Sequence, residues 1–257
     1  MAKWTAFPYD SAPYRRSSAA LKKAWPRLHL GDTEDCPKDP DLLRGWAQFH
    51  AGEFEQAHET GIRVGGAGIT LANKAQAIYA NYLEKTAATK QSMFHEVAAR
   101  AQAQAAREPT NANAYYWLAY ALGRYSQSIS VTKALAQGMG GRVKAALETT
   151  LALSPRHADA HIALGTFHAE VIDKVGKLLA RTQGADSATG LRMYQHALKL
   201  NPGSAIAMME YANGLVMLEG NKRMAEAEQL YARAAACEAA DAMERLDIEL
   251  AKAELAA

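Results

Sequence analysis

Three segments of the sequence repeat one another at intervals of 46 and 47 residues, and this periodicity constrains the fold more than any other feature. The segments read "REPTNANAYYWLAYALG", "LSPRHADAHIALG" and "LNPGSAIAMMEYANG", aligned on Pro109, Pro155 and Pro202. Nine positions after each proline stands a large residue, and a small residue follows it at once. The three pairs are Leu118 with Ala119, Leu164 with Gly165, and Tyr211 with Ala212. A fixed period of this length is typical of architectures in which one supersecondary unit stacks on the next.

Each repeat has the pattern of a helical hairpin. Proline ends one helix because it has no N–H to donate, and the next helix begins after a short polar turn. In the second half of each repeat, apolar residues three and four positions apart give one face that can be buried. These stripes are Leu147 and Leu151; Met193, Tyr194, Ala197 and Leu198; and Leu230, Tyr231 and Ala234. The composition is 49 % hydrophobic with much alanine, which favours helices. The sequence therefore predicts an all-α fold.

The pattern resembles the tetratricopeptide repeat, which has a small residue after a large one in its first helix and a proline at the close of its second. The segment "GWAQFHAGEFEQAHETG" (45–61) carries Gly45, Gly52, Phe54 and Ala57 at the offsets of that family. Another unit begins at "NKAQAIYANYLEK", where Tyr79 and Ala80 form the large-small pair. The resemblance implies a right-handed superhelix of about five helix pairs over residues 39–237.

The two central units depart from the family in length. Ala119 to Pro155 spans 36 positions and Gly165 to Pro202 spans 37, about a dozen more than in a standard repeat. The extra segments, "GRYSQSISVTKALAQGMGGR" and "AEVIDKVGKLLARTQGADS", are expected to extend the first helix of each pair and to end in a glycine-rich turn. Such lengthened pairs are similar to the divergent repeats of the TRAP-transporter-associated T proteins and of the regulator of microtubule dynamics family.

Both ends of the chain differ from the repeats. Residues 1–38 form a basic arm rich in proline and aromatic residues, with one short helix near residues 17–25 that Pro26 is expected to stop. We expect this arm to lie over the first repeats. Residues 238–257 are acidic and carry Met243, Leu246 and Leu250 on one helical side. They are expected to form a capping helix at the end of the stack.

The segment "SPRHADAHIALGTFHAE" carries three histidines. His157 and His161 would lie about 6 Å apart on a helix, a workable pair of zinc ligands, but His168 would lie roughly 10 Å beyond His161. The repeat register accounts for them otherwise, because His161 and His168 flank Leu164 where first helices pack and His157 falls at the turn. The sequence favours structural packing, and a metal-dependent enzyme using His157 and His161 stays as an alternative.

Other features exclude several function classes. No nucleotide-binding glycine loop, zinc-protease helix or nucleophile elbow occurs in the sequence, so we expect no enzyme and no cofactor. The chain has 29 Lys and Arg residues against 27 Asp and Glu residues, so its net charge is close to neutral. We therefore expect no electrostatic attraction to nucleic acid by the chain as a whole. The chain has neither an apolar secretion segment nor a run long enough for membrane insertion, and Cys36 and Cys237 have no metal or redox spacing. These features predict a cytoplasmic protein.

The family resemblance implies that the first helices line a concave groove. The positions two before and two after the large residue, together with the helix extensions, would then face a ligand. The candidates are Asn81, Tyr116, Tyr120, Arg124, Ile162, Thr166, Glu170, Lys174, Met209 and Asn213. Aromatic and hydrogen-bonding groups of this kind suit a peptide or helix of a protein partner. The sequence thus predicts a non-catalytic adaptor or scaffold, monomeric or dimeric. The second interpretation is a carrier for a small molecule or lipid, with an apolar tunnel lined by Met208, Met209, Tyr116 and Ile162.

Overall fold

The computed structural model describes residues 4–129 and 131–256, which form helices and turns without a β-strand. These residues fall into two compact units. The first unit is built from residues 4–29, 34–129 and 240–243, and the second from residues 30–33, 131–239 and 244–256. Among the described residues no helix is both long and apolar enough to cross a bilayer.

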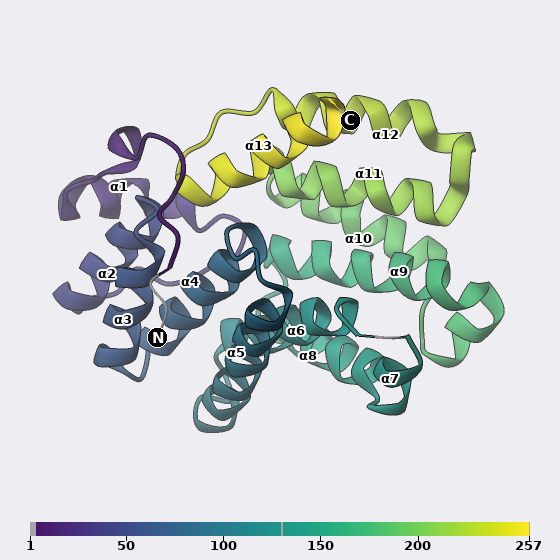
Figure 1. The fold of residues 1–257 in the computed structure, drawn as a ribbon, viewed down its shortest axis with the longest axis horizontal. Helices are drawn as coiled ribbons and strands as arrows, with labels where there is room; N and C mark the ends of the chain where they lie inside the picture. Colours follow the sequence, from purple (N-terminus) through teal and green to yellow (C-terminus); the bar gives the residue numbers. More distant parts are fainter. Residues whose placement is uncertain (1–3, 130, 257) are drawn as a thin grey trace. The chain divides into compact units, whose positions relative to one another are not determined.

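The first unit stacks its helices in chain order (Figure 1). Its elements are η1 (Ala12–Tyr14), α1 (Ser18–Leu28), α2 (Pro40–His50), α3 (Phe54–Val64), α4 (Gly68–Tyr82), α5 (Ala87–Arg107) and α6 (Ala112–Gln127). Each helix from α2 to α5 packs on the next one, and α4 also contacts both α2 and α6. The first helices of successive hairpins are therefore neighbours, as a repeat architecture requires.

The second unit continues the same pattern. Its elements are α7 (Val131–Ala136), α8 (Met139–Leu153), α9 (Ala158–Thr182), α10 (Ser187–Leu200), α11 (Ala205–Glu219), η2 (Gly220–Arg223), α12 (Met224–Ala235) and α13 (Ala242–Ala256), whose first residues belong to the first unit. Helix α9 packs on α8, α10 and α11, and α11 packs on α10 and α12.

The residue two positions after each repeat proline caps the helix that follows. The side chain of Asn111 accepts a hydrogen bond from the Ala114 N–H at 3.2 Å, and Ser204 accepts from Ala207 at 3.2 Å. His157 Nδ1 does the same for the Ala160 N–H at 3.0 Å. Each cap satisfies a backbone donor that the helix leaves unpaired. The proline period therefore sets where α6, α9 and α11 begin.

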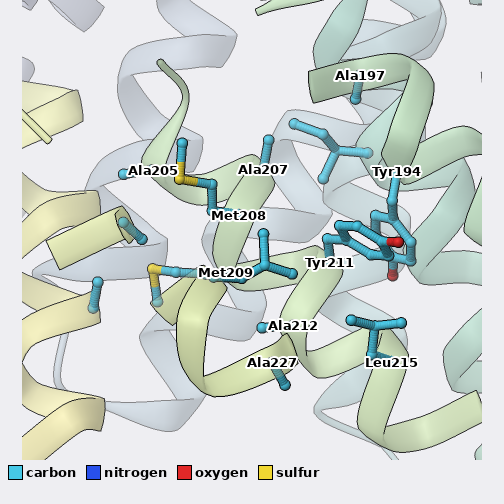
Figure 2. Packing of buried hydrophobic residues seen from close by; sticks show 14 of the residues in the cluster. Tyr194, Ala197, Ala205, Ala207, Met208, Met209, Tyr211, Ala212, Leu215 and Ala227 are labelled. Atoms are coloured by element: carbon cyan, nitrogen blue, oxygen red, sulfur yellow. The ribbon is translucent and has the colours of Figure 1, made fainter. Parts of the chain in front are cut away.

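The second unit has an apolar core drawn from α9 to α13 (Figure 2). Tyr194 of α10 stacks on Tyr211 of α11, with ring centroids 5.5 Å apart. Ile248 of α13 is buried in the same cluster, so the C-terminal helix covers apolar surface of the last hairpin. Tyr194 fits between two glycines: a Cβ built on Gly165 would lie 2.9 Å from its Cε1, and one on Gly214 would lie 2.4 Å from its Cε2.

Two details differ from the sequence-based expectations. Pro26 does not stop α1, which continues to Leu28 because the His29 N–H closes the last turn on the Trp25 carbonyl at 2.9 Å. The first long insertion is not one extension of its helix either, because α6 ends at Gln127 and the separate α7 follows. The second insertion does extend α9 to Thr182, with a break at Gly176, whose φ of 78° is not helical.

Candidate partner-binding site

Two positions of the repeat differ consistently in exposure. The residue two after the large one, the plus-two position, is half-buried in all four repeats that have it: Asn81, Tyr120, Thr166 and Asn213. The residue two before it, the minus-two position, is buried in all four: Ala77, Tyr116, Ile162 and Met209. Positions four apart lie about one turn apart on the same side of a helix, yet in these pairs only the plus-two side chains reach solvent.

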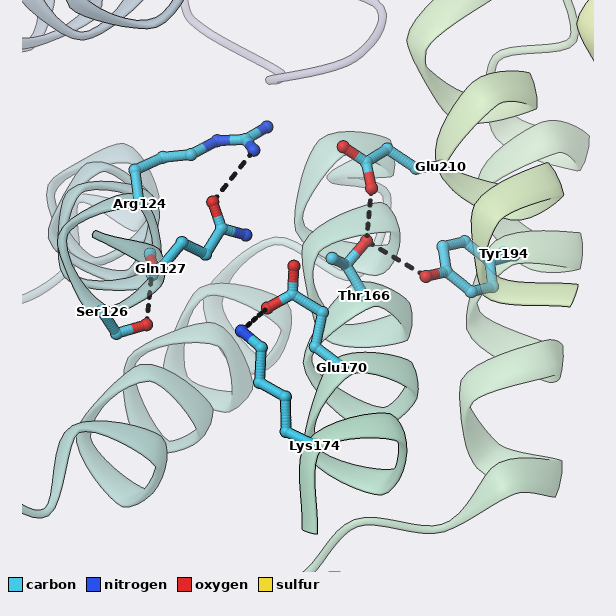
Figure 3. Close-up of polar contacts among 9 residues, drawn as sticks. Arg124, Ser126, Gln127, Thr166, Glu170, Lys174, Tyr194 and Glu210 are labelled. Carbon is cyan, nitrogen blue, oxygen red and sulfur yellow. Dashed lines mark hydrogen bonds and ion pairs between the residues drawn. The ribbon is translucent and has the colours of Figure 1, made fainter. Parts of the chain in front are cut away.

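In the second unit polar groups lie at and near the plus-two positions of α9 and α11. Thr166 Oγ1 donates to Glu210 Oε2 at 3.1 Å and accepts from the Tyr194 hydroxyl at 3.1 Å (Figure 3). Tyr194 comes from the second helix of the hairpin, and its ring spans the interior between Gly165 and Gly214. Thr166 is thereby fixed between a buried tyrosine and a half-buried carboxylate.

The same set extends one turn along α9. Lys174 Nζ lies 3.4 Å from Glu170 Oε2, and Glu170 is the more buried partner of this pair. On α11 the Tyr231 hydroxyl of α12 donates to Asn213 Oδ1. We call Thr166, Glu170, Lys174, Glu210 and Asn213 the α9–α11 strip. It combines two carboxylates, one ammonium group and two neutral hydrogen-bonding groups.

Burial and charge keep Tyr194 a neutral donor. Desolvation of its phenol raises the pKa of Tyr194 well above the ordinary value, and the negative charge of Glu210 raises it further. The Tyr194 hydroxyl donates to Thr166 Oγ1, which in turn donates to Glu210 Oε2.

In the first unit the corresponding residues lie on α4 and α6. The guanidinium of Arg124 lies over the ring of Tyr120, 5.4 Å from its centroid, and its Nη1 donates to Gln127 Oε1 at 3.3 Å (Figure 3). The backbone carbonyl of Asn81 accepts from Lys90 Nζ at 3.4 Å, and its side chain is half-buried. These contacts place a cation, an aromatic face and an amide on the first helices of this unit.

Three residues that the sequence assigned to the groove are buried instead. Ile162 and Met209 are 6 % and 3 % exposed and belong to the core of the second unit, and Tyr116 is 6 % exposed in the first. Met208, proposed to line an apolar tunnel, also packs into that core (Figure 2). Each of the three lies four residues before a half-buried plus-two side chain. Their burial removes them from a contact surface in this structure.

The histidines of α9 have partners of their own. His157 uses Nδ1 as the helix cap, and His161 Nε2 donates to the Pro155 carbonyl at 3.0 Å. His168 Nδ1 accepts from the Asp186 N–H at 3.1 Å. Burial lowers the pKa of both His161 and His168 below the ordinary value. Within residues 4–129 and 131–256, no group of three or more histidine, cysteine or acidic side chains is arranged to hold a metal ion.

Comparison with known proteins identifies the family. Residues 69–254 match the sequence model of the family described as "Regulator of microtubule dynamics protein 1-3". The chain belongs to this family. The corresponding resemblance, drawn from the lengthened repeats, is confirmed.

The fold of this family member is similar to that of TTC0263, a thermophilic TPR protein of Thermus thermophilus solved by crystallography. The TM-score is 0.59 at 16 % identity, and the match covers 83 % of this chain and 97 % of that chain. At this identity the likeness shows the fold alone, and it confirms the all-α, tetratricopeptide-like prediction. A comparison with curated protein sequences found no match.

Sequence reasoning missed three residues of this regulator-family chain that shape the α9–α11 strip. Glu210 was hidden because it stands directly before the large residue, although it lies three positions before Asn213 and so on the same helical face. Tyr194 and Tyr231 were assigned to the apolar stripes of second helices, but their hydroxyls reach Thr166 and Asn213 on the first helices. An amphipathic side chain buries its ring and still delivers its polar end.

Proposed function

We propose that the protein is a non-catalytic adaptor that binds an extended segment of a partner protein on the first helices of its repeats. The observation that carries the proposal is the plus-two position, which is half-buried and holds a hydrogen-bonding or aromatic side chain in all four repeats that have it. A helical-repeat fold supports binding of this kind, because such folds present extended surfaces built from successive units.

The chemistry of the α9–α11 strip favours a basic segment. Glu170 and Glu210 are half-buried carboxylates on neighbouring helices. The pair that Glu170 makes with Lys174 is part-exposed at 3.4 Å, and such pairs contribute little stability. A lysine or arginine of a partner can therefore replace Lys174 at small cost, while Thr166 and Asn213 offer groups for the partner's backbone.

The test is a peptide selection on the immobilised full-length protein. A random-sequence display library is enriched, and the selected peptides are measured against wild type, Glu170→Lys and Glu228→Lys. Glu228 is exposed on α12, a second helix, and makes the matched charge reversal away from the strip. We expect peptides enriched in lysine and arginine, at least tenfold weaker binding to Glu170→Lys, and binding to Glu228→Lys within twofold of wild type.

The result that contradicts the proposal is equally direct. If circular dichroism shows both variants folded and the selected peptides bind them equally, the α9–α11 strip is not the binding surface. Enrichment of acidic or purely apolar peptides that Glu170→Lys leaves unaffected also overturns the proposal.

A further inference from the structure

The N-terminal arm provides an internal example of a bound peptide. Residues 4–10 run without regular secondary structure in the first unit. The ring of Trp4 stacks on Tyr79 of α4, with centroids 4.3 Å apart and planes 17° apart, and lies 5.3 Å from the ring of His58 on α3. The arm thus begins with an aromatic anchor seated on the α3–α4 hairpin.

The backbone of the arm is also recognised by side chains. The Trp4 N–H donates to Glu55 Oε1 of α3 at 3.2 Å, and the Thr5 N–H donates to the Tyr79 hydroxyl at 3.1 Å. The side chains of Thr5 and Ala6 are exposed. Two consecutive backbone amides are therefore held whatever side chains Thr5 and Ala6 carry, which is how an extended peptide is bound with little dependence on its intervening sequence.

A second anchor follows three residues after the first. The ring of Phe7 meets Phe54 edge to face at 6.3 Å. It covers the turn between α2 and α3 at Gly52, where a Cβ would lie 2.6 Å from Phe7 Cγ. Gly52 also has a φ of 83°, which residues with a side chain rarely adopt. Glycine at this turn therefore leaves the space that the Phe7 ring fills.

We propose that the α3–α4 hairpin, with the Gly52 turn, is a second peptide-binding site that the chain's own arm occupies. Its external ligand is an extended protein segment with two aromatic side chains three residues apart. Trp4 and Phe7 remain half-buried, unlike the fully buried core rings Trp46 and Phe49. The arm is a tethered occupant, which competes at an effective concentration of about the millimolar range for short flexible links. Displacing it exposes the rings of Tyr79 and Phe54 that Trp4 and Phe7 contact.

The test removes the anchors and supplies the arm from outside. The full-length variant Trp4→Ala/Phe7→Ala and wild type are titrated with a fluorescein-labelled peptide of sequence WTAFPYDSAPY, followed by fluorescence anisotropy. We expect the variant to bind at least tenfold more tightly than wild type, whose own arm competes. A peptide with both anchor aromatics changed to alanine should bind the variant at least tenfold more weakly.

Variants of the hairpin locate the peptide. In the Trp4→Ala/Phe7→Ala background, Glu55→Ala should weaken peptide binding several-fold because it removes the acceptor of the first amide. Glu59→Ala, one turn further along α3 and exposed, should leave binding unchanged. Glu170→Lys should leave it unchanged too, so this site is distinguished from the α9–α11 strip.

Two outcomes overturn the proposal. Equal affinity of wild type and variant, or no binding to a variant that circular dichroism shows folded, means that the hairpin does not take an external segment. If sedimentation shows a wild-type dimer that the variant loses, the occupant is the arm of a second copy instead. Should the double variant not fold, Trp4→Ala alone serves the same comparison, because it removes the stacking on Tyr79 and so weakens the competition by the arm.

Discussion

A single tyrosine links the interior of the second unit to its surface. Tyr194 packs against Gly165 and Gly214, stacks on Tyr211 and donates its hydroxyl to Thr166. The small residue of the large-small pair therefore does more than allow two helices to pack closely. Gly165 makes room for a ring that crosses from the second helix and orients a polar group on the first. Core packing and surface chemistry are set by the same residue.

Gly165→Ala tests this packing at the residue scale. The new Cβ would lie 2.9 Å from Tyr194 Cε1, so the ring or α9 must shift. We expect a loss of about 1–3 kcal/mol in the free energy of unfolding, the usual cost of overpacking a core. Urea denaturation followed by circular dichroism measures it. Gly203→Ala, where a Cβ meets nothing within 4 Å, is the control and should change stability by less than about 0.5 kcal/mol.

The repeat register predicts only some of the residues of the candidate site. The repeat register predicts that the plus-two side chains are equivalent, because a periodic pattern fixes which positions correspond, and all four are half-buried. It did not identify which of two positions four residues apart is turned to the core. That choice depends on the crossing of first and second helices, which the pattern of Met209 and Asn213 alone does not contain. Glu210 was missed because it stands directly before the large residue Tyr211 and so belongs to neither register position.

At the scale of elements, helix starts were the most predictable feature. Each repeat proline is followed two residues later by a capping side chain, so the start of α6, α9 and α11 follows from local chemistry. Breaks inside long helical segments were less predictable. Gly176 interrupts α9 without ending it, whereas α6 ends at Gln127 without a proline or glycine at that point. Local helix propensity therefore does not predict where these long helical segments break.

His157 tests the capping argument at this scale. It is an unusual cap, and its Nδ1 accepts from Ala160 N–H while the ring is fully buried. His157→Ala should lower the free energy of unfolding by about 1 kcal/mol or more, since both the cap and the buried ring are lost. His157→Asn keeps a capping oxygen and should lose less. Thermal and urea unfolding of both variants measure the difference. If the alanine variant is as stable as the asparagine variant, the capping hydrogen bond does not contribute to stability.

At the scale of the whole chain, the proline period runs through both compact units. Pro109 lies in the first unit, and Pro155 and Pro202 lie in the second. The division falls between α6 and α7, inside the first lengthened repeat. Equal spacing in sequence predicts that hairpins recur, and it does not mark where one compact unit ends and the other begins. That is why the period predicted the repeats but not the two units.

The buried histidines of α9 make the stability of the chain depend on pH. Desolvation holds the pKa of His161 and His168 below the ordinary value, near 6.5, that these side chains regain on unfolding. His168 also faces Lys144 and Arg192, which lower its pKa, and Asp186 and Glu148, which raise it. His196 lowers that of His161, whose hydrogen bond to Pro155 acts in the opposite sense. Burial is the largest cause for both.

The sign of the effect follows from proton binding. As pH falls below about 6.5 the unfolded chain takes up these protons first, so the native state loses stability until the folded pKa values are reached. Above that window the contribution is fully present. We expect the urea midpoint of wild type to fall between pH 7.5 and 5.5. The double variant His161→Gln/His168→Gln should show a smaller fall, while His95→Gln, which changes an exposed histidine on α5, should keep the wild-type dependence. A double variant whose midpoint falls as steeply as that of wild type would place the pH dependence in other groups.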